Sequence, residues 1–366
     1  MRHHSPIAKL AAALALSLAS LALASARNFP PPTRVPLPPP RPAAVEACLA
    51  EQISGGSPLL KQGEAGLQSS GTTLALKMGF SPGISRPIAP PQQPQPPSDA
   101  EIRERTAKVV ANQHHDDEAI EQYERLERHV EQTAGNNPRI LDEKTYRVVP
   151  TGLGTMKLLL KDNDKPADPA DYLKQLQALK DTLELVLKPD DYRTKAASAK
   201  WQKKAHDRAE LVDAAHEAFT IHWIARETFR GRLCDIIELN PDPNFHPHGL
   251  YQEAFAHVNV KIWVDLETNQ LARGEARVTR DLSFGGGILG KLYRGGVFSL
   301  EQSEIAPGLW LPSRYQYDYT ARKFLFTSEQ HQYIEVSRFR LVGPPKQALA
   351  MVLSELAGAK SGYGDP

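Results

Sequence analysis

Residues 258–265 read VNVKIWVD, and this stretch decides the fold. Its even-numbered residues are apolar, whereas its odd-numbered residues are polar or amphipathic. That alternation is typical of a β-strand with one buried face. The sequence therefore predicts a sheet that has one side packed against a core and one side facing water.

Further β-prone stretches follow this strand, and short turn signals separate them. The signals are Glu267-Thr268-Asn269, Pro307-Gly308 and Glu329-Gln330. Strands joined by such short connections run antiparallel. We expect strands near residues 257–265, 270–280, 296–304, 309–320, 321–328 and 332–341, preceded by strands near 145–150, 156–160, 219–226 and 233–239.

Helical patterns flank these strands. Asp168-Pro169 resembles an N-cap followed by proline at the first helical position, and apolar residues then recur at three and four up to Lys188. A second helix is expected over 190–216, and a short one over 344–359. A charged stretch from Asp99 to about Thr133 predicts a helix that lies on the surface of the domain or projects from it. The fold class is α+β: a curved antiparallel sheet with helices on its concave side, an additional N-terminal helix and a disordered proline-rich segment.

The first 26 residues are typical of a secretory signal peptide. Arg2 and Lys9 precede an apolar run over residues 10–24, and Ala24-Ser25-Ala26 places small residues at the cleavage positions. The run is shorter than the roughly 20 residues that span a bilayer, although a retained N-terminal anchor is the alternative. We expect export to the periplasm.

Residues 27–98 hold 16 of the 30 prolines of the chain and few large apolar side chains. Such a segment cannot offset its own ordering entropy, so we expect a disordered or extended linker, either a passive tether or a ligand for an aromatic groove. Cys48 lies in this segment. Whether Cys48 forms a disulfide with Cys234 in the oxidising compartment stays open.

The composition excludes several classes of protein. With 44 Lys+Arg against 43 Asp+Glu, the chain lacks the basic excess of a nucleic-acid binder. A formal G-x-G-x-x-G occurs within residues 284–291, but its neighbours are antiparallel strands rather than a βαβ unit, so we expect no nucleotide cofactor. We interpret this loop as an apolar gate formed by Gly285, Gly286, Gly287, Ile288 and Leu289.

No catalytic or metal centre can be assembled from the sequence, so we expect a protein that is not an enzyme. His246-Pro247-His248 offers two imidazoles but no third metal ligand. Cys234 with His222 lacks an orienting residue and an oxyanion donor. Glu301 and Glu304 lie an odd number of residues apart, on opposite faces of a strand.

Aromatic residues form the strongest physical feature. Tyr315, Tyr317 and Tyr319 share one face of a strand, and Phe324 and Phe326 share one face of the next. They form either cross-strand packing pairs or the lining of a pocket for an apolar ligand, and both interpretations hold together if the sheet curves around a cavity.

Several motifs resemble the outer-membrane lipoprotein-sorting superfamily, the LolA, LolB and RseB group. They are residues 231–243, the stretch Lys261–Asp265 with a downstream 277–281, and Gly308-Leu309-Trp310-Leu311-Pro312. Residues 284–295 and 310–326 are most similar to uncharacterised exported proteins of Acidobacteria-type genomes. The resemblance covers about residues 145–343, and its motifs are structural rather than catalytic.

The resemblance implies an unclosed β-barrel over residues 144–343, with a helical insertion at about 168–216. The charged helical region of 99–143 precedes it, and a short helix and tail follow over 344–366. It further implies a carrier that holds lipid or the acyl chains of lipoproteins in envelope biogenesis. The alternative is an envelope sensor or scaffold that binds a protein partner, and an exported hydrolase is a more distant one. The expected apolar lining is Val260, Ile262, Val264, Ala276, Val278, Tyr315, Tyr317 and Phe324.

Overall fold

The computed structural model describes residues 95–135, 137–248, 250–284, 290–323 and 326–361. The described chain from Pro96 onward belongs to one compact unit. Four predicted features lie outside the described residues: the signal peptide, residues 27–94 of the proline-rich linker with Cys48, the gate loop over residues 285–289, and Phe324.

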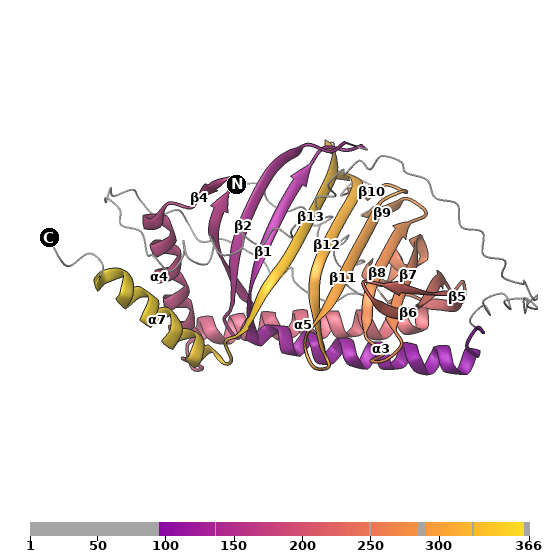
Figure 1. Ribbon diagram of the computed structural model, residues 1–366, viewed down its shortest axis with the longest axis horizontal. Helices are drawn as coiled ribbons and strands as arrows, with labels where there is room; N and C mark the ends of the chain where they lie inside the picture. Colours follow the sequence, from indigo (N-terminus) through magenta and orange to yellow (C-terminus); the bar gives the residue numbers. More distant parts are fainter. Residues whose placement is uncertain (1–94, 136, 249, 285–289, 324–325, 362–366) are drawn as a thin grey trace, which may run out of the picture. The chain divides into compact units, whose positions relative to one another are not determined.

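The described strands form one 13-stranded antiparallel sheet (Figure 1). The order along its main path is β4-β3-β2-β1-β13-β12-β11-β8-β7-β6-β5, and β10 pairs with β12 and β9 off this path. The end strands β4 and β5 do not pair with each other in this order, so the sheet is not closed. The strands are β1 (Tyr123–Gln132), β2 (Ile140–Pro150), β3 (Thr155–Asp162), β4 (Lys165–Pro166), β5 (Phe219–Phe229), β6 (Arg232–Pro241), β7 (Val258–Asp265), β8 (Leu271–Val278), β9 (Leu282–Phe284), β10 (Gly290–Leu292), β11 (Val297–Ala306), β12 (Leu309–Lys323) and β13 (Phe326–Leu341).

Helices begin where the sequence supplies caps. Ser98 and Glu101 form a capping box, in which each side chain bonds the backbone N–H of the other, while Asp168 and Asp191 accept hydrogen bonds at two further N-termini. The helices are α3 (Asp99–Ala119), α4 (Pro169–Val186), α5 (Tyr192–Ala218), α6 (Leu250–Glu253) and α7 (Pro345–Ser361), with 3-10 turns η1 (Ile120–Gln122) and η2 (Ala254–His257).

Helices α3 and α5 pack against one face of the sheet, which we call the inner face (Figure 1). Ile102 and Val109 of α3 and Ala218 of α5 join the apolar strand residues in the main core. The sheet therefore has the predicted fold class, an unclosed antiparallel sheet with helices inside it.

The other face, the outer face, carries α4 and α7. Leu179 and Leu183 of α4 pack with Val352 of α7 against Val149 and Leu158 of the sheet. Val149 and Leu158 belong to the opposite face because their neighbours Val148 and Leu159 align with the inner residues of β1. The predicted helical insertion thus divides between the two faces, with α4 outside and α5 inside.

The predicted helix over residues 99–133 is wrong in its second half. It ends at Ala119, and residues 123–132 form β1 between β13 and β2. The apolar residues of this stretch, Tyr123, Leu126 and Val130, occur at spacings of three and four, but pairing with two neighbouring strands outweighs that local signal. The helix that does form has many exposed residues, as expected for a surface position, and packs with one side against the inner face of the sheet.

The predicted break at Glu329-Gln330 is wrong as well. Both residues lie inside β13, where Glu329 pairs with Thr320 and Gln330 pairs with Tyr319. Residues 321–323 belong to β12 and residues 326–328 to β13, so the predicted strand 321–328 is two pieces of one hairpin. The turns at Glu267–Asn269 and Pro307-Gly308 are confirmed.

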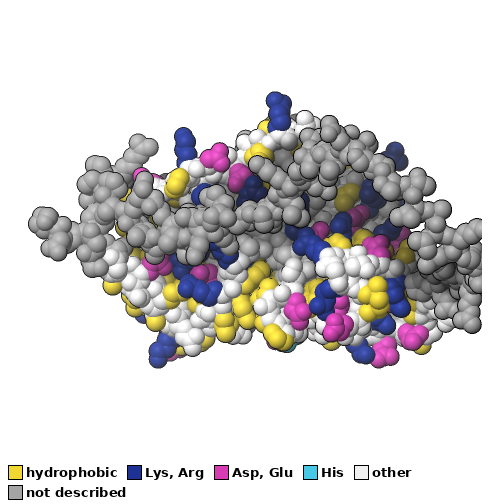
Figure 2. Space-filling model, viewed as in Figure 1, with side chains coloured by type: hydrophobic (Ala, Val, Ile, Leu, Met, Phe, Trp, Pro, Cys, Tyr) yellow, Lys and Arg dark blue, Asp and Glu magenta, His cyan; other side chains and the backbone are white. Residues whose placement is uncertain are grey.

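Charged side chains of both signs are interspersed on the face seen in Figure 2. This agrees with the near-balance of basic and acidic residues in the sequence. Within the described part of the chain, no helix combines the length and the hydrophobicity that crossing a bilayer requires.

Candidate ligand-binding site

Of the eight residues that were predicted to line a cavity, the seven that the structure describes share the inner face. Period-two alternation places them there, and the register aligns Val260 with Ala276 and Val258 with Val278 across β7 and β8. Seven of the eight belong to one buried core: Val260, Ile262, Val264, Ala276, Val278, Tyr315 and Tyr317.

Aromatic rings form a ladder along β11 and β12. Tyr315 and Tyr317 stack with ring centroids 6.3 Å apart, and Phe298 stacks on Tyr319 at 5.3 Å. Burial raises the pKa of Tyr319 to about 12, and it raises the pKa values of Tyr315 and Tyr317 further. The phenols stay neutral at physiological pH, so the ladder presents an uncharged surface.

An apolar row runs across five adjacent strands of the inner face. Residues directly opposite each other in an antiparallel pair lie on the same side of the sheet. The register makes each member of the row a neighbour of the next: Ile262 of β7, Gly274 of β8, Leu300 of β11, Tyr315 of β12 and Ile334 of β13.

Gly274 leaves free space in this row. A Cβ atom built on Gly274 would meet no heavy atom within 4 Å, although the residue is buried. Its backbone has no left-handed conformation that would itself require glycine. The inner wall is therefore open at this point rather than closed by packing.

Helix α3 covers the inner face mainly through polar side chains. Its buried residues include only two large aliphatic side chains, Ile102 and Val109, beside Thr106, Gln113, Asp116 and Asp117. Hydrogen bonds hold it in place: Asn112 donates to the carbonyl oxygens of Thr268 and Asn269 at 3.2 and 3.0 Å. Arg105 of α3 also pairs with the buried Asp235 of β6 at 3.4 Å. The contacts of α3 with the sheet are therefore largely polar, and water can replace polar partners when such groups become exposed.

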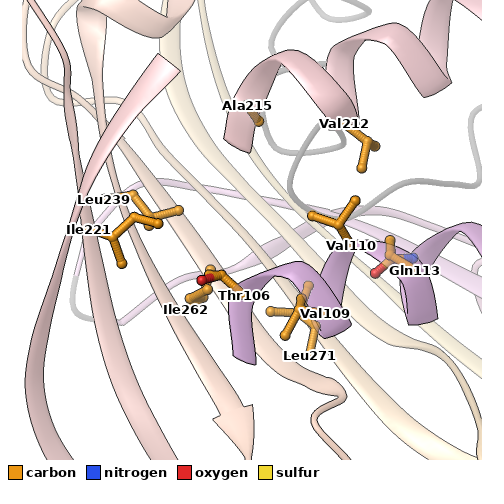
Figure 3. Close-up of a pocket in the computed structure, with 10 residues that line it drawn as sticks. All are labelled: Thr106, Val109, Val110, Gln113, Val212, Ala215, Ile221, Leu239, Ile262 and Leu271. Carbon is orange, nitrogen blue, oxygen red and sulfur yellow. The ribbon is translucent and has the colours of Figure 1, made fainter. Parts of the chain in front are cut away.

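A cavity of about 50 Å³ lies between α3, α5 and the sheet (Figure 3). At roughly 10–15 Å³ per molecule, it has room for about three to five waters, which is much less than an acyl chain needs. The lining residues are Thr106, Val109, Val110 and Gln113 of α3, Val212 and Ala215 of α5, and Ile221, Leu239, Ile262 and Leu271 of the sheet.

Among the predicted lining residues, only Ile262 lines this cavity. The other six that the structure describes belong to the same buried core but do not line the cavity. Sequence reasoning missed the four residues of α3 because this helix shows no continuous apolar stripe of the kind that marks a packed helix, and it did not single out Val212 and Ala215 of α5 either. The interrupted series Ile102, Thr106, Val109 and Gln113, at spacings of three and four, was the available signal.

A group of buried and half-buried charged side chains, which we call the polar cluster, lies on the inner face beyond β13. It consists of Arg125, Glu127 and His129 of β1 and Lys157 of β3. Glu127 Oε1 accepts from Arg125 Nε at 3.0 Å, while Glu127 Oε2 lies 2.5 Å from Lys157 Nζ and 2.9 Å from His129 Nε2. Because Glu127 is only 1% exposed, water does not compete for these contacts.

The electrostatics of the polar cluster fix the charge of Glu127. Burial alone raises the pKa of this carboxyl, but the charges of Lys157 and Arg125 outweigh burial and hold the pKa well below its usual value. Glu127 therefore stays ionised and stabilises two cations in the interior.

The pairing register of β1, β2 and β3, together with a bulge in β13, determines where the side chains of the polar cluster lie. Arg125 pairs with Val148 of β2, and Val148 pairs with Lys157 of β3, which brings both cations to one face. In β13 the register slips between Ser337 and Arg340 opposite this position, and Arg338 adopts a φ of 54°. Such bulges re-aim side chains. Sequence reasoning missed the cluster because β1 carries charges on both faces.

The alternative catalytic and metal candidates do not come together. Glu227, not His222, lies opposite Cys234, which is a buried free thiol whose pKa burial raises to about 11. Glu301 bonds Arg230 and Arg273, whereas Glu304 bonds Arg232.

Metal-ligating side chains do not gather either. His246 and His248 are both exposed in the loop after β6. Over the described residues, no three His, Cys, Asp or Glu side chains are grouped as metal ligands.

No protein-family model matches the chain, and no curated protein does. Solved structures resemble it at low identity. An outer-membrane lipoprotein-sorting protein domain from Vibrio parahaemolyticus is 8% identical, with a TM-score of 0.29, over 64% of this chain and 92% of its own. A DUF1329-family protein from Desulfovibrio piger is 12% identical, with a TM-score of 0.26, over 66% and 92%.

A LolA-superfamily protein from Nitrosomonas europaea is 10% identical, with a TM-score of 0.25, over 68% of this chain and 96% of its own. Two of the three carry the name of the superfamily that the sequence motifs resemble. TM-scores below 0.5 are too low to carry a function to this chain, so the functional assignment depends on the geometry of its own inner face.

Proposed function

We propose that the protein is an exported carrier that binds an apolar ligand, the acyl chain of a lipid or a lipoprotein, between the sheet and the helices α3 and α5. The observation that carries the proposal is the apolar row, which crosses five strands and is open at Gly274. Each methylene buried there contributes roughly 0.8 kcal/mol.

Binding of a whole acyl chain requires α3 to move away from the sheet, because the cavity has only about 50 Å³. The polar contacts of α3 favour this movement. Its buried surface is dominated by Thr106, Gln113, Asp116 and Asp117, which water can solvate once the helix leaves. The ligand then replaces Ile102 and Val109 as the apolar partner of the sheet.

Filling the free space at Gly274 tests the proposal. Gly274→Leu places an isobutyl side chain in the apolar row without displacing a neighbour at its Cβ position. We expect acyl binding to weaken at least tenfold while the melting temperature stays the same or rises. The measurement is titration of the delipidated protein with a neutral acyl ligand, monopalmitoylglycerol, by isothermal calorimetry.

Arg277→Leu is the matched control, because it adds a side chain of the same kind to the exposed outer face of the same strand. It should leave binding unchanged. A wild-type protein that binds no acyl ligand, and that is purified gently without lipid, contradicts the carrier function. A stoichiometric envelope protein in that same preparation would support the sensor alternative.

A further inference from the structure

The apolar row ends at the polar cluster. Ile334, its last member, lies directly opposite His129 of β1, and Val336 on the same face lies opposite Glu127. The path from Gly274 along the row to Ile334 and on to His129 crosses four strand spacings, roughly 19 Å. This length is comparable with that of an extended long acyl chain. The apolar row with the polar cluster at one end therefore matches an amphiphile, which has an apolar chain and a charged head group.

Arg125 carries an open hydrogen-bond donor in this cluster. The residue is 3% exposed, and its Nε and Nη2 atoms contact Glu127 at 3.0 Å. Its Nη1 atom is buried and has no hydrogen-bond partner. A buried guanidinium donor without an acceptor is costly, and its planar fork suits carboxylate or phosphate oxygens.

The positive charges of Arg125 and Lys157 are only partly balanced by nearby acids. Arg125 and Lys157 share the single charge of Glu127. One further acid, Glu121 of η1, interacts with Arg125, but burial raises its pKa and disfavours its charged form. Asp117, which also lies near Glu121, is paired with Arg208 of α5 at 3.6 Å. An added anion therefore improves the pairing of the two cations.

We infer that the polar cluster binds the anionic head group, a carboxylate or a phosphate, of an acyl ligand whose chain lies along the apolar row. This inference rests on the proposed carrier function and adds the class of ligand. Arg125 Nη1 donates to the head group, Lys157 supplies the second positive charge, and Glu127 neutralises part of this positive charge when no ligand is bound.

Three ligands with the same acyl chain test this inference in the full chain after delipidation: palmitate, palmitoyl lysophosphatidic acid and neutral monopalmitoylglycerol. Arg125→Gln should weaken the binding of the anionic ligands about tenfold and leave the neutral one unchanged. Glu127→Gln should strengthen anion binding, because it removes the competing negative charge. Arg128→Gln, on the outer face of the same strand, is the matched control and should change nothing.

The two substitutions in the cluster act in opposite directions only if the cluster binds an anion, since damage to the fold would weaken binding in both. If Arg125→Gln does not fold, Lys157→Gln replaces it, with the same expected loss. A response of palmitate alone identifies a carboxylate, and a response of the lysophospholipid alone identifies a phosphate. Equal loss for all three ligands, or none, overturns the inference, whereas a wild-type protein that binds none of them overturns the carrier function instead.

Discussion

Asp116 shows how a single buried carboxyl couples the docking of α3 to pH. It is 1% exposed, contacts His115 Nδ1 at 3.1 Å and accepts a hydrogen bond from the backbone N–H of Trp310 in β12. Burial raises its pKa to about 6, although both contacts lower it. The ionised form of Asp116 is therefore unfavourable while α3 is docked.

The sign of the pH dependence follows from this shift. An unfolded Asp ionises near pH 3.9, so between about pH 4 and 6 the folded chain binds more protons than the unfolded chain. The contribution of Asp116 to stability is thus present below this range and is lost as the pH rises through about 6. We expect the free energy of unfolding of the wild type, relative to Asp116→Asn, to fall by roughly 1–3 kcal/mol between pH 4 and 7.

Urea denaturation at several pH values measures that difference. His115→Gln provides a control, because loss of the ring contact should move the midpoint to a higher pH. Parallel pH profiles for the wild type and Asp116→Asn would show that this carboxyl does not titrate in the folded protein.

At the scale of one helix, the proposed function requires α3 to leave the inner face, where hydrogen bonds from Asn112 help to hold it. Asn112→Ala removes two bonds to the turn after β7 while it improves the intrinsic helix propensity. We expect α3 to undock more often by a factor of about 5–30, which corresponds to roughly 1–2 kcal/mol. Faster amide hydrogen exchange in α3, together with faster association of an acyl ligand, would report this undocking.

Gln177→Ala is the control for this experiment, because it removes a side-chain hydrogen bond to Asp181 on the exposed surface of α4. It should leave exchange in α3 unchanged. If Asn112→Ala changes neither exchange nor association, α3 is not the element that opens the site.

The same element shows what the sequence could and could not predict. Strand β7 alternates cleanly, so period two alone predicted that Val260, Ile262 and Val264 share one face, but that this face is the inner one depends on where α3 and α5 pack. Strand β1 has charged residues on both faces, so nothing local distinguished it from a helix, and its place depends on pairing with β13 and β2. The polar cluster could not be predicted either, because its charged residues belong to β1 and β3, which are not consecutive strands.

At the scale of the whole described unit, the two largest buried clusters lie on opposite faces of one sheet. The inner core holds the apolar row beneath α3 and α5, and the outer core joins α4 and α7 to β2 and β3. Arg147 strengthens the outer core through ion pairs with Glu124 at 3.0 Å and Glu355 at 2.7 Å. Because the sheet separates the two cores, we expect stability to depend on both and binding on the inner core alone.

A pair of matched cavity mutations tests this separation. Leu179 of α4 is fully buried in the outer core, and Leu300 of β11 is buried in the apolar row. Replacing either by Ala should cost about 2–5 kcal/mol in the free energy of unfolding. Only Leu300→Ala changes the surface that an acyl chain touches, so only this variant should alter acyl affinity under conditions where both remain folded. An equal change in affinity for Leu179→Ala would mean that the ligand senses the stability of the whole unit rather than the shape of its inner face.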